Sequence, residues 1–463
     1  MTVVEAAPPT AARHPRRRGG LFWHRDFRLL WIGQATSKFG SSVTSVALPL
    51  VAVATLGATT FQVALLAAAA WVPWLIIGLP AGAWVDRLPR RPVMVVCNVA
   101  SMLLFLSIPV AAGLDVLTIE QLLVVALGAG TASVFFQTAY QVYLPALLRP
   151  EEVPEGNAKL QGTEAVAQVA GPGAAGLIAQ AFGAVLALLA DAIGFLVSAV
   201  CLLAIRTPEP RATGKRRSGS LRREIGEGLH FLVRDPYLWV LTVFGAVSNL
   251  CLIGYQAILV VFLVDEVGLS PGLVGGLIGG MSLGGVLGAA LATPIARRFG
   301  TARGLIVSEL GVAPFGLLIP LAAPGPRLLL AVAGGVVLIA GVVAGNVIKG
   351  SFRQTYTPHH MLGRVTVSMQ LLNYGTIPIG ALLAGALGTA LGVRTAMWIT
   401  MGGLALTGLI LLVGPIRQRR DLPSQPPSGH QPPVGNDVTS AVRCPPADPS
   451  APGSPRTPPS APR

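Results

Sequence analysis

The sequence predicts an all-α membrane protein whose transmembrane helices form two pseudo-symmetric halves of six helices each. Of its 463 residues, 52% are hydrophobic and only 12% are charged, whereas about a quarter of the residues of a soluble domain are charged. The apolar residues are grouped in runs of about twenty, the length that an α-helix needs to cross a bilayer. Composition and run length together therefore predict a chain that crosses the membrane many times.

Twelve apolar runs lie along the chain, six before and six after a charged interval. The first six cover residues 27–53, 61–84, 93–113, 117–140, 164–182 and 185–205. The other six cover residues 237–264, 272–295, 304–323, 328–348, 366–391 and 396–416. We therefore expect an N-terminal half over residues 21–205 and a C-terminal half over residues 236–417.

The segments outside these halves are expected to differ from one another. The tails, residues 1–20 and 418–463, are rich in proline and have almost no aliphatic run to bury, so both are predicted to be disordered in the cytoplasm. Residues 206–235 link the halves, and apolar residues recur in this linker at helical spacing. They are Leu221, Ile225, Leu229 and Leu232. This pattern predicts a short amphipathic helix on the cytoplasmic membrane surface.

The formal net charge of +14 does not indicate a nucleic-acid partner, because the arginines follow the membrane topology. They gather before the first span, in the even-numbered connections and after the last span, whereas the odd-numbered connections contain four acids and only two arginines. Under the positive-inside rule, both termini are cytoplasmic. We therefore expect a multi-pass protein of the plasma membrane.

The two halves resemble each other at matching positions. The stretch "YLPALLRP" after the fourth span matches "YTPHHMLGR" after the tenth, and Pro172 in the fifth span matches Pro378 in the eleventh. A repeated six-span unit is typical of secondary transporters, which bind their substrate between the two repeats.

Two motifs resemble signatures of the major facilitator superfamily. The turn "GAWVDRLPRR" resembles the loop signature between helices two and three of that family, with Pro89 in place of the usual glycine. Its matching residues are Gly82, Asp86, Arg87, Arg90 and Arg91. The stretch "GPGAAG" resembles a helix-five signature of the exporter branches, with matching residues Gly171, Pro172 and Gly176.

Further stretches are similar to the drug:proton antiporters related to enterobactin exporters and macrolide efflux proteins. They are "RDFRLLWIGQ", "VALPL", "GRVTVSMQ" and "PIGALLAG", and the resemblance covers about residues 22–416. It implies a secondary active exporter of hydrophobic or amphiphilic small molecules, such as drugs, antibiotics, secondary metabolites or siderophores. Proton antiport and alternating access are implied too, although helix four lacks the arginine that many drug antiporters carry.

Two other functions are alternatives to export. An uptake permease for a small nutrient shares the same fold, but the helix-five signature favours export. A non-transporting sensor built on a transporter body is the other alternative, and the sequence contains nothing that resembles an added signalling domain.

The charged turn has two interpretations. Its arginines orient the loop toward the cytoplasm, which alone explains their presence. The resemblance implies a second role, in which Asp86 faces the positive N-terminal end of helix eleven and closes the cytoplasmic side as a latch.

Lys38 is unusual because it lies about ten residues inside the first span, where a lysine costs about 2.5–3.5 kcal/mol on insertion scales. Gln34, Lys38, Ser41 and Ser45 share one helix face by their spacing. This stripe is expected to face a central substrate cavity. The alternative is a structural ion pair between Lys38 and a neighbouring helix.

Three acids are candidates for proton coupling. Asp191 lies deep in the sixth span, where burial disfavours its charged form; a paired structural acid is the alternative. Glu164 and Glu309 lie nearer the cytoplasmic ends of their helices, where a helix-dipole contact explains them at least as well. Further cavity candidates, for which interhelical hydrogen bonds are the commoner role, are Gln137, Asn249, Gln256 and Asn373.

The sequence does not predict an enzyme. It contains no Walker-type loop for ATP, no metal-ligand spacing and no nucleophile elbow, and its four cysteines follow no regular pattern. We therefore expect no cofactor and no metal. The expected partners are a small-molecule substrate, protons and the lipid bilayer, with the chain acting as a monomer.

Overall fold

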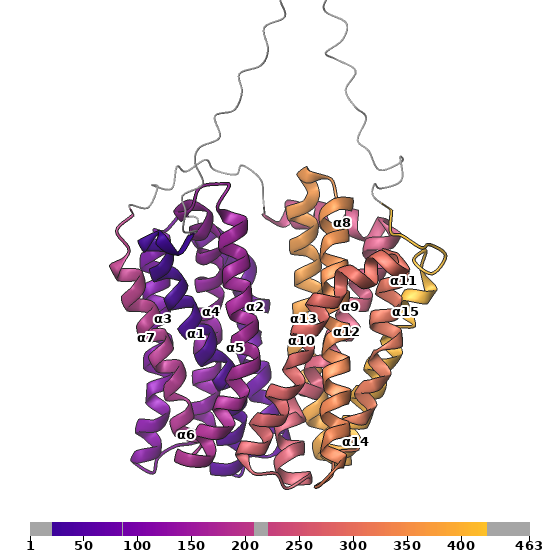
Figure 1. Cartoon of the computed structure of the whole chain (residues 1–463). Helices are drawn as coiled ribbons and strands as arrows, with labels where there is room; N and C mark the ends of the chain where they lie inside the picture. Colours follow the sequence, from indigo (N-terminus) through magenta and orange to yellow (C-terminus); the bar gives the residue numbers. More distant parts are fainter. Residues whose placement is uncertain (1–20, 86, 208–220, 424–463) are drawn as a thin grey trace, which may run out of the picture. The chain divides into compact units, whose positions relative to one another are not determined.

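The residues that the computed structural model describes, 21–85, 87–207 and 221–423, are helices joined by short turns (Figure 1). Twelve helical stretches in this part of the chain are long and apolar enough to cross a membrane, which confirms the predicted number of spans. No strand occurs in the described ranges, so the all-α class is confirmed as well. The predicted disorder of residues 1–20 and 424–463 lies outside the described residues.

The first six spans belong to the N-terminal half. They are α1 (Arg25–Leu50) with the π-helical η2 (Val51–Thr55), α2 (Thr60–Val85), α3 (Arg90–Gly113), α4 (Ile119–Leu147), α5 (Val153–Phe182), and α6 (Ala184–Ala187) with α7 (Leu189–Ala204). A short 3-10 turn, η1 (Leu21–Trp23), precedes α1.

Helix α8 (Leu221–Arg234) lies in the linker, and the other six spans follow it. They are α9 (Pro236–Val261) with η3 (Phe262–Glu266), α10 (Pro271–Phe299), α11 (Thr301–Ile306) with η4 (Val307–Gly311) and η5 (Ala313–Leu318), α12 (Arg327–Tyr356), α13 (His359–Leu391), and α14 (Val393–Thr407) with α15 (Ile410–Val413).

Several helices are longer than the apolar runs that predicted them. Helix α5 begins at Val153 rather than at Glu164, and α12 continues to Tyr356 rather than ending at Ile348. Backbone hydrogen bonds continue through polar residues, whereas an apolar run ends at the first of them. These extensions carry polar side chains that line the cavities described below.

The buried apolar side chains show where the two halves pack together. One large cluster joins them, with Val43 from the first half and Ile258 from the second. Two further clusters are confined to one half each, and they contain Phe27 in the first half and Ile416 in the second. Both lie at the helix ends where α1 begins and the last span ends, which we call the terminal side. The halves therefore share a core away from the terminal side.

The linker helix α8 packs against α13 and α9. Arg364 of α13 donates a hydrogen bond of 2.5 Å to Glu227 of α8. Leu232 is fully buried against the bundle, whereas Leu229 is 40% exposed. The predicted amphipathic helix thus corresponds to α8, although the side chains of the other two apolar positions lie outside the described residues.

The boundary of the predicted disordered C-terminal tail at residue 418 is wrong. The carbonyl oxygen of Arg420 accepts hydrogen bonds from the N–H groups of Ala302 (3.1 Å) and Arg303 (3.3 Å). The Asp421 carboxylate accepts another from the N–H group of Thr301 (2.9 Å). The first N–H groups of a helix have no intrahelical partner, so these residues cap α11 and hold the chain in place beyond residue 418.

Candidate functional site

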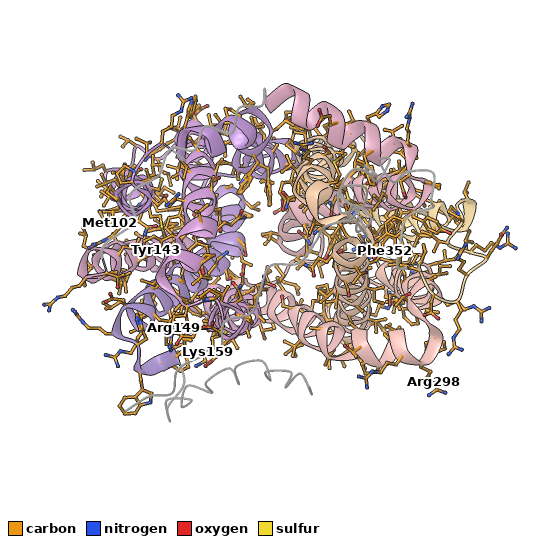
Figure 2. The ribbon with its side chains drawn as sticks, turned by 90° about the horizontal axis from the view of Figure 1, so that it is seen from above. Met102, Tyr143, Arg149, Lys159, Arg298 and Phe352 are labelled. Carbon is orange, nitrogen blue, oxygen red and sulfur yellow. The ribbon has the colours of Figure 1, made fainter. Side chains whose placement is uncertain are left out.

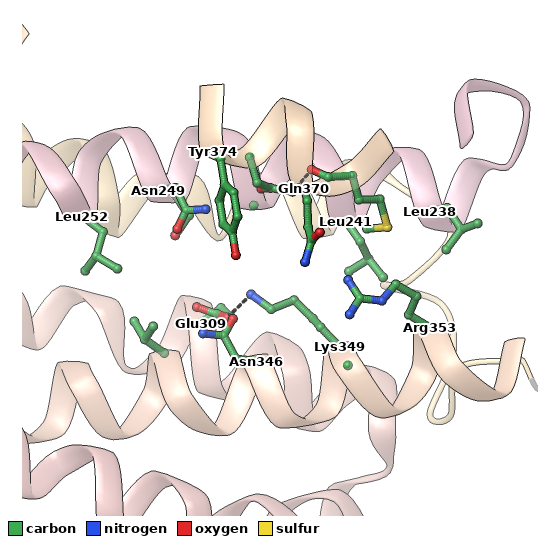
Figure 3. Close-up of a pocket in the computed structure, with 16 residues that line it drawn as sticks. Leu238, Leu241, Asn249, Leu252, Glu309, Asn346, Lys349, Arg353, Gln370 and Tyr374 are labelled. Carbon is green, nitrogen blue, oxygen red and sulfur yellow. Dashed lines mark hydrogen bonds and ion pairs between the residues drawn. The ribbon is translucent and has the colours of Figure 1, made fainter. Parts of the chain in front are cut away.

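A polar cavity lies within each half. The C-half cavity has a volume of about 390 Å³ and is formed by α9, α12 and α13 with one residue of η4 (Figure 3). The N-half cavity has a volume of about 260 Å³ and is formed by α1, α4 and α5. In each case the cavity is formed by the first, fourth and fifth spans of its half. The repeated architecture thus produces the same kind of site twice.

An ion pair lies in the C-half cavity. Lys349 of α12 donates a hydrogen bond of 2.8 Å to Glu309 (Figure 3), and its ammonium lies 4.6 Å from the centre of the Phe244 ring. Glu309 is only 5% exposed and belongs to η4, a π-helical turn of the kind that is frequent at functional sites. A nearly buried carboxylate is thus neutralised by a lysine from another helix.

The N-half cavity contains a corresponding ion pair. Lys38 of α1 donates a hydrogen bond of 2.9 Å to Glu164 of α5. Gln34 and Gln137 line the same cavity. The two interpretations of Lys38 therefore describe one arrangement, because the residue makes an interhelical ion pair and also lines a cavity.

The structure places the other members of the predicted Lys38 stripe outside the N-half cavity. Ser41 donates a hydrogen bond of 3.2 Å to Asp191 of α7, and Ser45 donates one of 2.7 Å to the carbonyl oxygen of Ser42. The helical spacing places all four residues on one side of α1. That side of α1 faces the cavity only in the part of the helix that is nearer the terminal side. Of the predicted stripe, Gln34 and Lys38 thus line the cavity. Ser41 contacts α7, and Ser45 bonds within α1.

Asp191 lies at the packed interface between α1 and α7. It is 1% exposed, and a Cβ atom at Gly40 of α1 would lie 2.6 Å from the Cα atom of Asp191. Only a glycine allows the two backbones to approach this closely. This position outside both cavities favours the interpretation of Asp191 as a structural acid.

The remaining predicted cavity residues divide between lining and non-lining positions. Asn249 and Asn373 line the C-half cavity. Gln256, further along α9, is exposed and is not among the residues that line either cavity.

The sequence analysis missed the polar face of α12. Asn346, Lys349 and Arg353 all line the C-half cavity, and Figure 3 shows Arg353 pointing into it beside Lys349. The signal was present in "NVIKGSFR", where these residues recur at spacings of three and four. It was overlooked because the apolar run ends at Ile348.

The charged turn is only partly described. Asp86 lies outside the described residues, so the latch stays a prediction. Gly82 lies near the end of α2, Arg87 is exposed, and Arg90 is the first residue of α3. Arg91 donates hydrogen bonds to the carbonyl oxygens of Leu202 (2.7 Å) and Leu203 (2.5 Å). These acceptors lie in the last turn of α7, where carbonyl groups lack the usual partner four residues ahead, so Arg91 fastens the turn to that helix.

The helix-five motif lies where the two halves meet. A Cβ atom at Gly275 of α10 would lie 2.3 Å from the carbonyl oxygen of Pro172 and 2.6 Å from the Cα atom of Gly176. Gly171 of the same motif packs against Ser42 of α1. The small residues thus allow α5 to touch α10 on one side and α1 on the other.

These features define a class of protein, namely a polytopic helical membrane protein with two related six-helix halves and a polar cavity in each. The sequence over residues 30–375 matches the family model of the Major Facilitator Superfamily. The chain belongs to this family, which confirms the resemblance of its motifs.

Curated relatives and solved structures agree with this assignment. The multidrug efflux pump Tap of Mycolicibacterium fortuitum is 28% identical over 86% of this chain and 98% of the relative. Macrolide efflux protein A of Streptococcus pyogenes is 18% identical over 54% of this chain and 61% of the relative.

Among solved structures, the nucleoside transporter NupG (D323A mutant) has a TM-score of 0.70 at 12% identity, covering 84% of this chain and 99% of that one. A bacterial homologue of the iron transporter ferroportin has a TM-score of 0.68 at 17% identity, covering 84% of this chain and 98% of that one. At these identities the two structures establish the fold alone.

Proposed function

We propose that the chain is a secondary active exporter of hydrophobic or amphiphilic small molecules, driven by the inward flow of protons. The observation that carries the proposal is the similarity to a multidrug efflux pump over nearly the whole length of both chains. The similarity to a macrolide efflux protein supports the same direction of transport. The solved structures do not favour uptake, because their low identity carries no information on substrate or direction.

Alternating access requires contacts between the halves that can open and close, and the structure contains suitable ones. Trp71 and Trp74 of α2 contact the ring of Tyr374 on α13 at centroid distances of 5.7 and 5.9 Å. These rings meet midway along α2 and α13, beside the C-half cavity that Tyr374 lines, whereas the contact between α5 and α10 lies away from the terminal side. Both cavities lie toward the terminal side, so this conformation corresponds to one that is open to the cytoplasm.

Glu309 and Glu164 are the acids best placed for proton coupling. Each lines a cavity and pairs with a lysine, and a carboxylate that binds a proton can no longer form that ion pair. Protonation therefore changes the charge that each cavity presents and frees the lysine. Asp191 has no lysine or arginine partner among the described residues and lies between two packed helices.

The orientation of the chain in the plasma membrane belongs to the same proposal. Arginines gather at the helix ends on the terminal side, and Figure 2 shows Arg298 at the end of α10 projecting away from the bundle. The positive-inside rule then places the terminal side in the cytoplasm. We take the monomer as the transporting unit because each half contributes one cavity.

Growth and accumulation assays test the proposed direction of transport. A bacterial strain lacking its own efflux pumps would express the chain and be exposed to erythromycin and to ethidium. Export predicts a raised inhibitory concentration for at least one compound and a lower steady-state accumulation, which a protonophore restores to the level of the empty strain. Higher accumulation in the expressing strain would instead favour uptake, and no change for either compound in a well-expressed, membrane-inserted protein would contradict export of this class.

A further inference from the structure

Carboxamide side chains dominate the N-half cavity. Five of its eleven lining residues are Asn or Gln, namely Gln34, Gln137, Gln141, Asn157 and Gln161. A carboxamide offers two hydrogen-bond donors and one acceptor oxygen without carrying a charge. A hydroxyl group is its complement, because it both donates and accepts. A wall of carboxamides from three helices is therefore suited to a ligand with several hydroxyl groups.

The charges of the N-half cavity cancel each other. Lys38 and Glu164, which are 2.9 Å apart, are the two charged side chains among its lining residues. An organic cation would have to displace Lys38 from Glu164, and an anion would have to displace Glu164 from Lys38. The cavity thus favours neither class of ion.

Gln34 supplies the observation that points to a ligand. Its side chain is only 5% exposed, and its buried Nε2 atom has no hydrogen-bond partner in the described part of the chain. A buried donor without a partner is unfavourable, so a site that retains one has a use for it. Gln34 is one of the residues that line the cavity, so a ligand hydroxyl group that seats against this carboxamide would supply the missing acceptor.

The C-half cavity repeats this composition. Four carboxamides line it, namely Asn249, Asn346, Gln370 and Asn373, and the Oδ1 atom of Asn373 is buried without a partner in the described ranges. The C-half cavity residue Arg353 has a buried Nε donor without a partner in these ranges as well, so both cavities contain polar groups that no side chain of the described chain uses. The first, fourth and fifth spans carry carboxamides in both halves, so the enrichment follows the repeat.

We propose that the N-half cavity is a binding site for a neutral polyhydroxylated group, such as the sugar ring of a glycosylated amphiphile. Gln34, Gln137 and Gln161 bind the hydroxyl groups, and the ring of Tyr140 supplies an apolar face. The inference rests on the proposed export function, because it names the class of molecule that is exported.

Binding of a matched pair of neutral probes tests this site. 4-Methylumbelliferyl β-D-glucoside carries a sugar, and 7-methoxy-4-methylcoumarin has the same ring system with a methyl group in its place. Equilibrium dialysis against the full chain in lipid nanodiscs gives both dissociation constants. A site built for hydroxyl groups rejects a ligand that lacks them, so the glucoside should bind at least about tenfold more tightly. Equal binding of the two probes, or no binding of the glucoside, would overturn the proposal.

Two variants of the same helix separate the site from general effects. Gln161→Leu removes a cavity carboxamide of α5, and Gln168→Leu makes the same change at an exposed position of α5 outside both cavities. The first should weaken glucoside binding about tenfold, by the loss of hydrogen bonds to the ligand, while the second leaves it unchanged. The same loss in both variants would contradict the site.

Gln34→Leu distinguishes binding from stability. Because the variant removes an unpaired buried donor, a purely structural account predicts unchanged binding and an equal or higher melting temperature. The proposal predicts the same melting behaviour with a glucoside dissociation constant raised about tenfold. Unchanged binding contradicts it. Glucoside binding in a chain that exports neither erythromycin nor ethidium would refute the export function alone, whereas export of erythromycin without glucoside binding would refute this inference alone.

Discussion

Lys349 and Glu309 illustrate what a single charged residue requires inside an apolar bundle. The lysine side chain is 19% exposed and that of the glutamate 5%, so neither charge is well solvated. Removing one partner of a buried ion pair costs about 3–5 kcal/mol, because the other charge is left without compensation. The pair therefore has to be understood as one unit that links η4 to α12.

This residue-scale account predicts the stability of Glu309 variants. Glu309→Gln should lower the melting temperature clearly, since Lys349 loses its counter-charge, and the double variant Glu309→Gln/Lys349→Met should recover most of the loss. Thermal unfolding of the purified protein in detergent measures both changes.

The matched control is Glu266→Gln, which disrupts the more exposed pair between Arg394 and Glu266. An exposed pair contributes only about 0–1 kcal/mol, so this variant should melt close to the unchanged protein. A Glu309 variant that melts like the Glu266 variant would contradict the account.

At this scale the sequence predicts the unusual residues but not their partners. Lys38 is visible because it interrupts an apolar run, whereas its partner Glu164 lies 126 residues away and is brought to it only by the packing of α1 against α5. Lys349 and Arg353 escaped notice for the opposite reason. They follow the end of an apolar run, and a basic residue in that position is typical of an ordinary membrane boundary.

At the scale of helices, the contact between α5 and α10 controls how closely the halves approach. The backbone of Gly275 touches the backbone of the helix-five motif, with no space for a side chain. Interfaces in the membrane use such small residues because packing, rather than the hydrophobic effect, holds helices together there. This interface has to separate when the transporter opens to the opposite side.

A methyl group at this contact should shift the conformational equilibrium. Gly275→Ala places a Cβ atom against a backbone carbonyl, so it should favour the state in which α5 and α10 are apart. Spin labels at Phe182 and Leu273, both exposed near this contact, report the separation as a distance distribution. Gly276→Ala is the control, because a Cβ atom there meets open space. The same distance distribution in both variants would show that this contact does not limit how closely α5 and α10 approach each other.

The helices themselves could be predicted better than their ends. Apolar runs reveal the membrane-spanning part of each helix, because the bilayer requires apolar side chains over that length. They do not reveal how far a helix continues once its side chains face a polar cavity, as α5 does from Val153. The C-terminal half was predicted to end at residue 417, and this end was wrong for a similar reason. The Arg420 carbonyl group caps α11, and the sequence does not reveal this contact.

For the whole molecule, the arrangement of two related halves predicts a definite topology. Reporter fusions after residue 424 and at Gly268, in the turn between η3 and α10, should report opposite sides of the membrane. The arginine distribution places the first of them in the cytoplasm. If both reporters were found on the same side, the chain would have an even number of spans between them and the repeat would be broken.

The central claim is that an inward proton flow drives export through acids paired with lysines, and flux in everted membrane vesicles tests it most directly. The cytoplasmic face is then outside, and the lumen is acidified. Antiport predicts that vesicles containing the chain accumulate erythromycin beyond the passive uptake of vesicles without it, and that nigericin abolishes this excess. Vesicles with Glu309→Gln should show only the passive uptake. Excess accumulation that persists without a pH gradient, or that requires an alkaline lumen, would contradict the account.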